Sequence, residues 1–120
     1  MNTKITGNKG EDKASQFLIE KGYSVLDRNW RTKAGEIDII AVKDDLIVFV
    51  EVKTLPNGTP ELLQNELNQQ KLQRIIKTSK RFLLNHRQYS NSYVRYDVIV
   101  IDMPGLPEVY HIENAFTELL

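Results

Sequence analysis

The sequence contains no cysteine among its 120 residues. This absence excludes disulfide bonds, thiolate metal sites and cysteine nucleophiles together. No apolar run approaches the roughly 18–20 residues that a membrane-spanning helix needs, and the polar first ten residues lack an apolar signal core. We therefore expect a cytoplasmic protein without membrane contact, folded as one domain over residues 1–120, since domains cluster at about 100–150 residues.

The formal net charge of the sequence is zero, because 16 Lys and Arg residues balance 16 Asp and Glu residues. Proteins that bind nucleic acid non-specifically usually carry a net positive charge. The charge is unevenly distributed, however: from Glu66 to Arg95 seven basic residues stand against one acidic residue. Such a division suits a protein that binds cations in one place and phosphates in another, and it also describes an ordinary solvated helix face. The sequence shows no glycine-rich phosphate loop and no arrangement of Ser, His and Asp that we can place.

The pattern of apolar residues predicts an α/β domain with the order α-β-β-β-α-β. Helices are predicted at 8–21 and from 62 or 66 to 85, and strands at 23–29, 35–42, 46–53 and 93–101. Gly22 is expected to end the first helix. A short last strand at 109–112 and a final helical turn capped by Asn114 are expected at the end. This order favours a mixed central sheet flanked by helices.

Three ionisable residues interrupt strands that are otherwise apolar. Asp38 lies in the second predicted strand, and Glu51 and Lys53 end the third. Charged groups beside a dry sheet are costly unless something compensates them. Alternate strand residues face the same side, so Glu51 and Lys53 project together, and the neighbouring strand brings Asp38 alongside Glu51. We therefore expect a Mg²⁺ or Mn²⁺ site with oxygen ligands from Asp38, Glu51 and the Val52 carbonyl.

In such a site the metal would polarise a phosphodiester and lower the pKa of a bound water. Lys53 would orient that water, help to deprotonate it, or stabilise charge on the phosphate. The alternative without function is a surface ion pair between Glu51 and Lys53 at a strand end. Such a pair contributes little to stability.

The segments Gly35-Glu36-Ile37-Asp38 and Val50-Glu51-Val52-Lys53 resemble the D…ExK signature of the PD-(D/E)xK nuclease superfamily. The whole chain more closely resembles the YraN-like family of small bacterial proteins of unestablished function. That resemblance implies a restriction-endonuclease-like core, with Asp38 and Glu51 as metal ligands and Lys53 as the catalytic lysine. The other features that carry it are Gly10-Glu11 with Ala14, Asn29-Trp30-Arg31, Lys71, Arg95-Tyr96-Asp97 and Asn114-Ala115-Phe116.

The resemblance also implies roles for residues outside the two strand motifs. Glu11 matches the first-helix glutamate of resolvase-like members, which approaches the metal site. Gln70 and Lys71 occupy the region where relatives place a polar or basic active-site helper. Glu36 is expected on the opposite face of its strand from Asp38. Many relatives carry a basic residue shortly after the lysine, whereas this sequence has Thr54-Leu55. The resemblance therefore implies no phosphate contact from this loop.

Basic residues of the long predicted helix form a candidate nucleic-acid surface. They recur at spacings of three or four and share part of one face: Lys71, Arg74, Lys77 and Arg81. Arg31 beside Trp30 could clamp or stack on a nucleic acid. The alternatives are a solubilising helix face and a packing role for Trp30.

The remaining candidates for a metal ligand are assigned other roles. Asp97 begins a buried strand and is expected to pair with a nearby arginine rather than with metal. His86 and His111 are isolated in the sequence, and neither is assigned a ligand role.

Three functions are compatible with these residues. The leading hypothesis is a metal-dependent endonuclease that hydrolyses phosphodiester bonds in DNA, including branched or single-stranded structures. The second is a catalytically inactive nucleic-acid-binding or adaptor module that keeps the nuclease fold, and the third is a purely structural domain. Because the net charge is zero, a homodimer or a protein partner is expected to complete the DNA-binding groove.

Overall fold

The computed structural model describes residues 3–118, and the side chains of residues 9–118. The elements are α1 (Thr3–Glu20), β1 (Ser24–Arg31), β2 (Glu36–Lys43), β3 (Leu46–Thr54), α2 (Pro60–Glu66), α3 (Gln69–Asn85), the 3₁₀ helix η1 (Arg87–Tyr89), β4 (Tyr93–Ile101) and β5 (Val109–Phe116). The predicted order is confirmed, with the long helical stretch divided into α2 and α3 and the short last strand expected at 109–112 extended to Phe116. Within residues 3–118, none of the helices has the length and apolar composition needed to cross a membrane.

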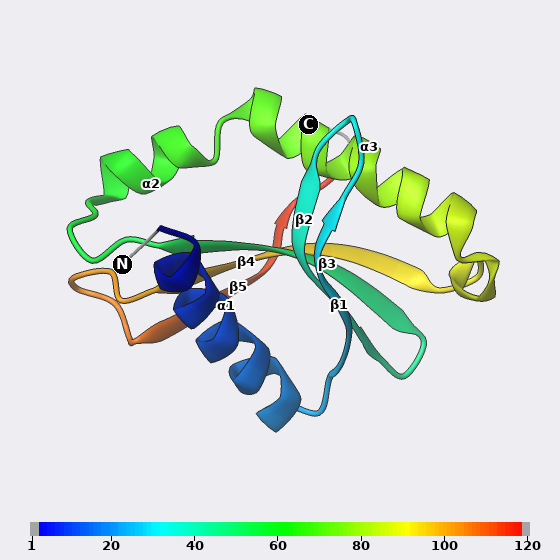
Figure 1. Ribbon diagram of the computed structural model, residues 1–120, viewed down its shortest axis with the longest axis horizontal. Helices are drawn as coiled ribbons and strands as arrows, with labels where there is room; N and C mark the ends of the chain where they lie inside the picture. The colour runs from blue at the N-terminus through cyan, green and yellow to red at the C-terminus, as the bar shows by residue number, and fades with distance from the viewer. Residues whose placement is uncertain (1–2, 119–120) are drawn as a thin grey trace.

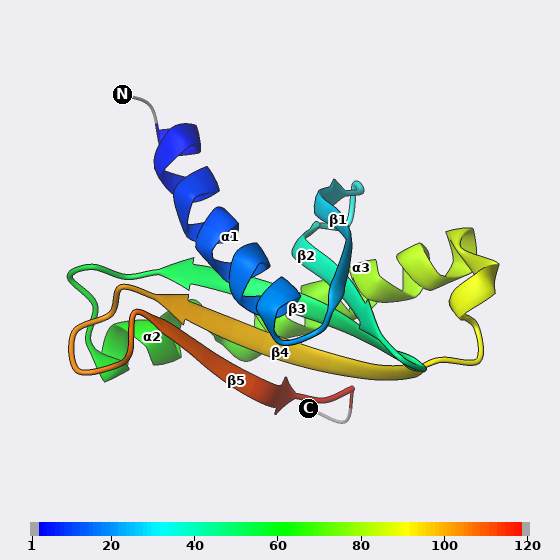
Figure 2. The ribbon, with the colours of Figure 1, turned by 90° about the horizontal axis from the view of Figure 1, so that it is seen from below.

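The five strands form one mixed sheet in the order β1-β2-β3-β4-β5. Only β3 and β4 run parallel, and the other neighbouring pairs are antiparallel. Parallel neighbours need a long crossover connection, which α2 and α3 provide. Helix α1 covers one face of the sheet, and α3 covers the other (Figures 1 and 2). The expected mixed sheet flanked by helices is therefore present.

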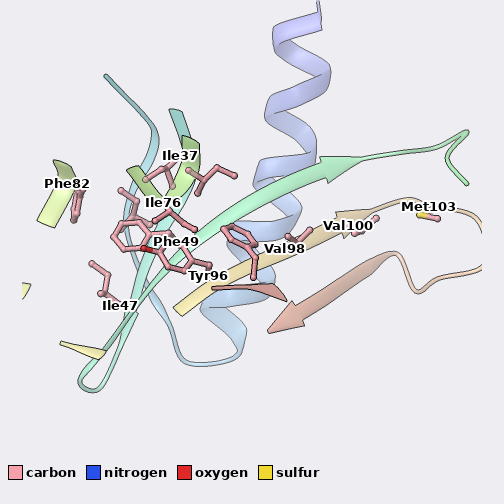
Figure 3. Close-up of a cluster of buried hydrophobic side chains, with 12 residues drawn as sticks. Ile37, Ile47, Phe49, Ile76, Phe82, Tyr96, Val98, Val100 and Met103 are labelled. Carbon is pink, nitrogen blue, oxygen red and sulfur yellow. The ribbon is translucent and has the colours of Figure 1, made fainter. Parts of the chain in front are cut away.

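Both faces of β3 are buried, as the uninterrupted apolar run of its sequence predicts. The side chains from Ile47 to Val50 are fully inaccessible to solvent. On one face Phe49 packs with Tyr96 of β4 and Phe82 of α3, within the cluster drawn in Figure 3. On the other face Val48 and Val50 pack in a second cluster that includes Ala14 and Leu18 of α1.

Strands β2 and β3 separate at the end of β3 that carries the candidate residues. Their pairing runs from Lys43–Leu46 to Ile39–Val50 and extends no further toward the end of β3. Strand β3 stays paired with β4 as far as Thr54. Glu51 and Lys53 are therefore held by β4 on one side and face an opening on the other, and Asp38 lies at this opening.

The expected helical turn at Asn114 is wrong, because β5 continues to Phe116. Asn114 lies within the strand with φ of 53°, and its backbone N–H donates to Asp97 Oδ1 at 2.9 Å. The pairing of β4 with β5 is irregular between Tyr96 and Val98, next to this contact. A buried carboxylate thus holds the backbone at Asn114 in the sheet, where the sequence alone suggested a cap.

Gly10 sets how closely α1 approaches the end of β3. A Cβ atom at Gly10 would overlap Thr54 Oγ1 and lie 3.4 Å from Thr54 Cβ. Only glycine allows this approach, and it brings the next residue, Glu11, to the edge of the candidate site.

We expect Gly10→Ala to lower the free energy of unfolding by about 1 kcal/mol, measured by urea denaturation. Overpacking typically costs about 1–3 kcal/mol, and the better helix propensity of alanine returns about 1 kcal/mol. Thr54→Ala removes the hydroxyl group that the new Cβ atom would overlap. In the Thr54→Ala background, Gly10→Ala should therefore lower the free energy of unfolding much less than it does in the wild type. Additive losses from the two substitutions would show that this contact does not limit the approach of α1.

Candidate active site

Asp38, Glu51 and Lys53 meet at the opening between β2 and β3. The backbone N–H of Val52 donates to Asp38 Oδ2 at 2.8 Å, and a hydrogen bond joins the Asp38 and Glu51 carboxyl groups. Lys53 Nζ lies 3.6 Å from Glu51 Oε1. The side chains of Glu51 and Lys53 are only 16% and 20% exposed. Neither is therefore an ordinary surface residue at a strand end.

The Asp38 carboxyl group is held in conditions that favour its protonated form. Burial raises the pKa of Asp38 most, the negative charge of Glu51 and the hydrogen bond to Glu51 raise it further, and together they bring it to about 8. The hydrogen bond from the Val52 N–H opposes this rise only in part. Near neutral pH the Asp38 carboxyl group is therefore mostly protonated.

Asp97, a second buried carboxylate, has a contrasting environment. It accepts hydrogen bonds from Arg95 Nε and Nη2, both at 2.8 Å, as well as from the Asn114 N–H. His111 Nε2 lies 2.7 Å from Asp97 Oδ2. Burial alone would raise the pKa of Asp97, but these hydrogen bonds outweigh it and the pKa is lowered. The expected pairing with an arginine is confirmed. The fold therefore balances the negative charge of Asp97 with hydrogen bonds and an arginine, whereas among the described residues it gives Asp38 no such cationic partner.

Glu66, at the end of α2, lies at the mouth of the site. Its Oε2 atom is 3.5 Å from Lys53 Nζ and 3.2 Å from Lys71 Nζ. The hydrogen bond from Lys71 and the charge of Lys53 lower the pKa of Glu66. Sequence reasoning missed this residue, because only the fold of α2 over the end of β3 brings it to the two lysines. The arrangement shows that Lys53 and Lys71 together can hold an anionic oxygen.

Glu11 lies beside the carboxyl pair but does not form a ligand cluster with it. Its Oε1 atom accepts a hydrogen bond from Asn29 Nδ2 at 2.7 Å and lies 3.6 Å from Arg28 Nη2. Burial raises the pKa of Glu11, and the charge of Asp38 contributes to the rise. Among the side chains that the structure describes, no three His, Cys, Asp or Glu residues converge as a metal-binding group. A metal ion here would need backbone, water or substrate oxygens besides the two carboxylates.

Glu36 lies on the same side of the molecule as the site, so its expected position on the opposite face is wrong. It lines the same cleft as Glu51, and its charge helps to raise the pKa of Asp38. The physical reason is simple, since residues two apart in a strand share a face. Glu36 also forms an ion pair with Arg31 at 3.1 Å.

The cleft at the site has a volume of about 430 Å³. It lies between the turn that joins β1 to β2 and the first half of α3. Of the residues predicted to bind nucleic acid, Lys71, Arg74 and Arg31 line this cleft. Gln70 does not line it and is exposed to solvent. The cleft, which we call the catalytic cleft after the function proposed for it, therefore places Glu51 and Lys53 beside the basic side chains of Arg31, Lys71 and Arg74.

Residues 10–101 match the uncharacterised protein family UPF0102. The chain belongs to this family. It is 43% identical to the UPF0102 protein of Treponema denticola over 121 residues, covering 92% of this chain and 93% of the relative. The UPF0102 protein of Treponema pallidum is 40% identical, with 98% and 96% covered, and that of Alkaliphilus oremlandii is 42% identical, with 97% and 100% covered. The resemblance to the YraN-like family is thereby confirmed.

The UPF0102 match includes every residue of the site from Glu11 to Arg74. The family description states no activity, so the function of this UPF0102 member has to be inferred from the site itself.

Replacement of Asp38 by asparagine should change how stability depends on pH. The folded pKa of about 8 lies above the ordinary value of 3.8, so folding takes up a proton between these values. Stability from this proton is complete below about pH 4 and is lost as the pH rises through 8. Asp38→Asn should therefore become more stable than the wild type as the pH rises, by about 1–3 kcal/mol at pH 8.

The measurement is urea denaturation in EDTA from pH 5 to 9, with Asp45→Asn as a control at the β2–β3 turn. Parallel curves for wild type and Asp38→Asn would contradict the raised pKa of Asp38.

Proposed function

We propose that this protein is a metal-dependent endonuclease that hydrolyses phosphodiester bonds in DNA. One observation carries the proposal: the Asp38 and Glu51 carboxyl groups lie together, largely buried, with Lys53 beside Glu51 and with Lys71 and Arg74 in the adjoining cleft. Burying two carboxyl groups side by side lowers the free energy of unfolding, and folds rarely retain such an arrangement unless it has a function. Residues with strongly shifted pKa values in clefts are common at active sites. The fully compensated Asp97 shows that this chain can satisfy a buried carboxylate where structure alone requires it.

The donor set fits Mg²⁺ or Mn²⁺. Asp38 and Glu51 would supply carboxylate oxygens, and a divalent cation would displace the proton held by Asp38. The Val52 N–H faces Asp38, and the N–H and carbonyl of one strand residue point to the same side, so the Val52 carbonyl is a suitable third oxygen. Mg²⁺ in phosphoryl-transfer sites typically uses one or two carboxylates and leaves its other positions to water and phosphate. When bound, such an ion polarises the phosphodiester and lowers the pKa of a bound water.

Lys53 has the position of a catalytic lysine. Its ammonium group lies 3.6 Å from Glu51, so it can orient a water molecule at the edge of the carboxyl pair and stabilise charge that develops on the phosphate. Lys71 lies across the mouth of the cleft, where both lysines contact Glu66. A substrate phosphate would compete with the Glu66 carboxylate for these two ammonium groups.

The proposal is tested by cleavage of fluorescently labelled DNA with Mn²⁺ or Mg²⁺. The substrates should include a single strand, a duplex and a branched structure. We expect Lys53→Met to lower kcat by about 100-fold or more, as loss of a positioned proton-transfer or charge-stabilising group typically does, while Mn²⁺ binding persists. Lys80→Met removes a lysine that pairs with Glu118 away from the cleft and should leave cleavage unchanged.

Full cleavage by Glu51→Gln would contradict the mechanism. Binding of DNA without cleavage by the wild type in either metal would instead favour the alternative, a nucleic-acid-binding module that keeps the fold without turnover.

A further inference from the structure

A second cleft adjoins the catalytic cleft along α3. It has a volume of about 590 Å³ and is lined by Trp30, Lys33, Lys77 and Arg81, among others. The two clefts share Arg31 and Thr32. We call it the distal cleft.

The tip of the β1–β2 hairpin reaches α3 (Figure 1). A Cβ atom at Gly35 would lie 3.0 Å from Thr78 Oγ1 and 3.7 Å from Arg74 Cγ. Arg74 lines the catalytic cleft, and Lys77, three residues further along α3, lines the distal cleft. A ligand longer than one cleft would therefore follow α3 past the hairpin tip.

The distal cleft is basic without a balancing acid. No acidic residue is among those that line it. Within residues 9–118, Lys33, Lys77 and Arg81 form no ion pair, whereas Lys13 and Arg95, elsewhere on the molecule, contact carboxylates. Unpaired cations gathered in one hollow produce a local positive potential although the net charge of the chain is zero. The cleft is suited to a ligand with several negative charges.

The spacing of the cations suits a repeating anion. Lys71, Arg74, Lys77 and Arg81 lie within an eleven-residue stretch of α3, whose ten steps of 1.5 Å extend about 15 Å. They lead from the mouth of the catalytic cleft to the distal cleft. A polynucleotide backbone, with one phosphate per nucleotide, matches such a row better than a compact anion does.

Trp30 gives the distal cleft an apolar surface. Its ring packs edge-on against Phe82, with centroids 5.3 Å apart, and the residue is half-buried and also lines the cleft. Proteins that bind single strands combine a basic groove with aromatic contacts to unpaired bases. In a duplex the base faces are covered by stacking. Trp30 therefore favours a single strand as the occupant.

We propose that the distal cleft binds an unpaired nucleic-acid strand next to the phosphate that is cleaved. Lys33, Lys77 and Arg81 contact its phosphates, and Trp30 contacts a base. This inference deepens the proposed nuclease function and rests on it for the position of the cleaved bond, but strand binding itself requires neither metal nor turnover.

Trp30 is the one tryptophan of the chain, so its fluorescence reports on the distal cleft directly. The experiment titrates a 12-nucleotide single strand, and a duplex of the same length, into the full chain in EDTA at several salt concentrations. We expect the single strand to quench Trp30 and to bind more tightly than the duplex. Since log K for single strands changes by about −0.7 per phosphate contact with log salt, three contacts predict a slope of about −2.

The test variant is Lys77→Gln/Arg81→Gln, which keeps Trp30. It should lose about tenfold or more in affinity, and its salt slope should become shallower by about 1.4. The matched control is Lys80→Gln/Arg87→Gln, which removes the same charge from residues that line a separate hollow with Leu84. The control should stay within about twofold of the wild type. Equal losses in both variants, or equal quenching by the duplex, would overturn the inference.

Cleavage with Mn²⁺ is measured separately with the same variants. Strand binding that depends on Lys77 and Arg81 without any cleavage would leave the distal cleft established and the nuclease function refuted. Cleavage with unchanged KM in Lys77→Gln/Arg81→Gln would leave the nuclease function standing and refute the distal cleft.

Discussion

Repulsion between two carboxyl groups, Asp38 and Glu51, sets the chemistry of this molecule. Strands β2 and β3 bring the two groups together where their pairing ends, and the Val52 N–H holds the Asp38 carboxyl group there. Burial and the proximity of Glu51 raise the pKa of Asp38 to about 8, because two buried like charges cannot both ionise cheaply. The Lys53 ammonium group, 3.6 Å from Glu51, offsets part of this repulsion, and a proton or a divalent cation at Asp38 would relieve the rest. The proposed metal dependence follows from that constraint.

The rest of the fold holds the pair in place. Strand β3 is covered on both faces, by α1 and by α3, and its centre is wholly buried. Gly10 lets α1 approach the end of β3 closely, and β4 keeps that end in the sheet beyond the point where β2 departs. A rigid scaffold of this kind can maintain an unfavourable arrangement at its edge, because the buried core offsets the cost. In the same sheet the carboxylate of Asp97 is fully hydrogen-bonded.

Local patterns in the sequence predicted the strands, the end of α1 at Gly22 and the meeting of Asp38 with Glu51, since each depends on strand periodicity or a single turn. Contacts made by distant segments were not predictable in this way. Glu66 reaches the lysines only through the path of α2, and His111 meets Asp97 only because β5 pairs with β4. The helical turn expected at Asn114 was wrong for the same reason.

Isothermal titration of Mn²⁺ into the wild type and into Asp38→Asn/Glu51→Gln tests the central claim most directly. We expect the wild type to bind Mn²⁺ and to release a proton near pH 7, so that the measured enthalpy depends on the ionisation enthalpy of the buffer. The double variant keeps the shape of the site without its charge and should show no binding. Equal heats from both proteins, or no binding by the wild type at millimolar Mn²⁺, would contradict a metal site at the carboxyl pair.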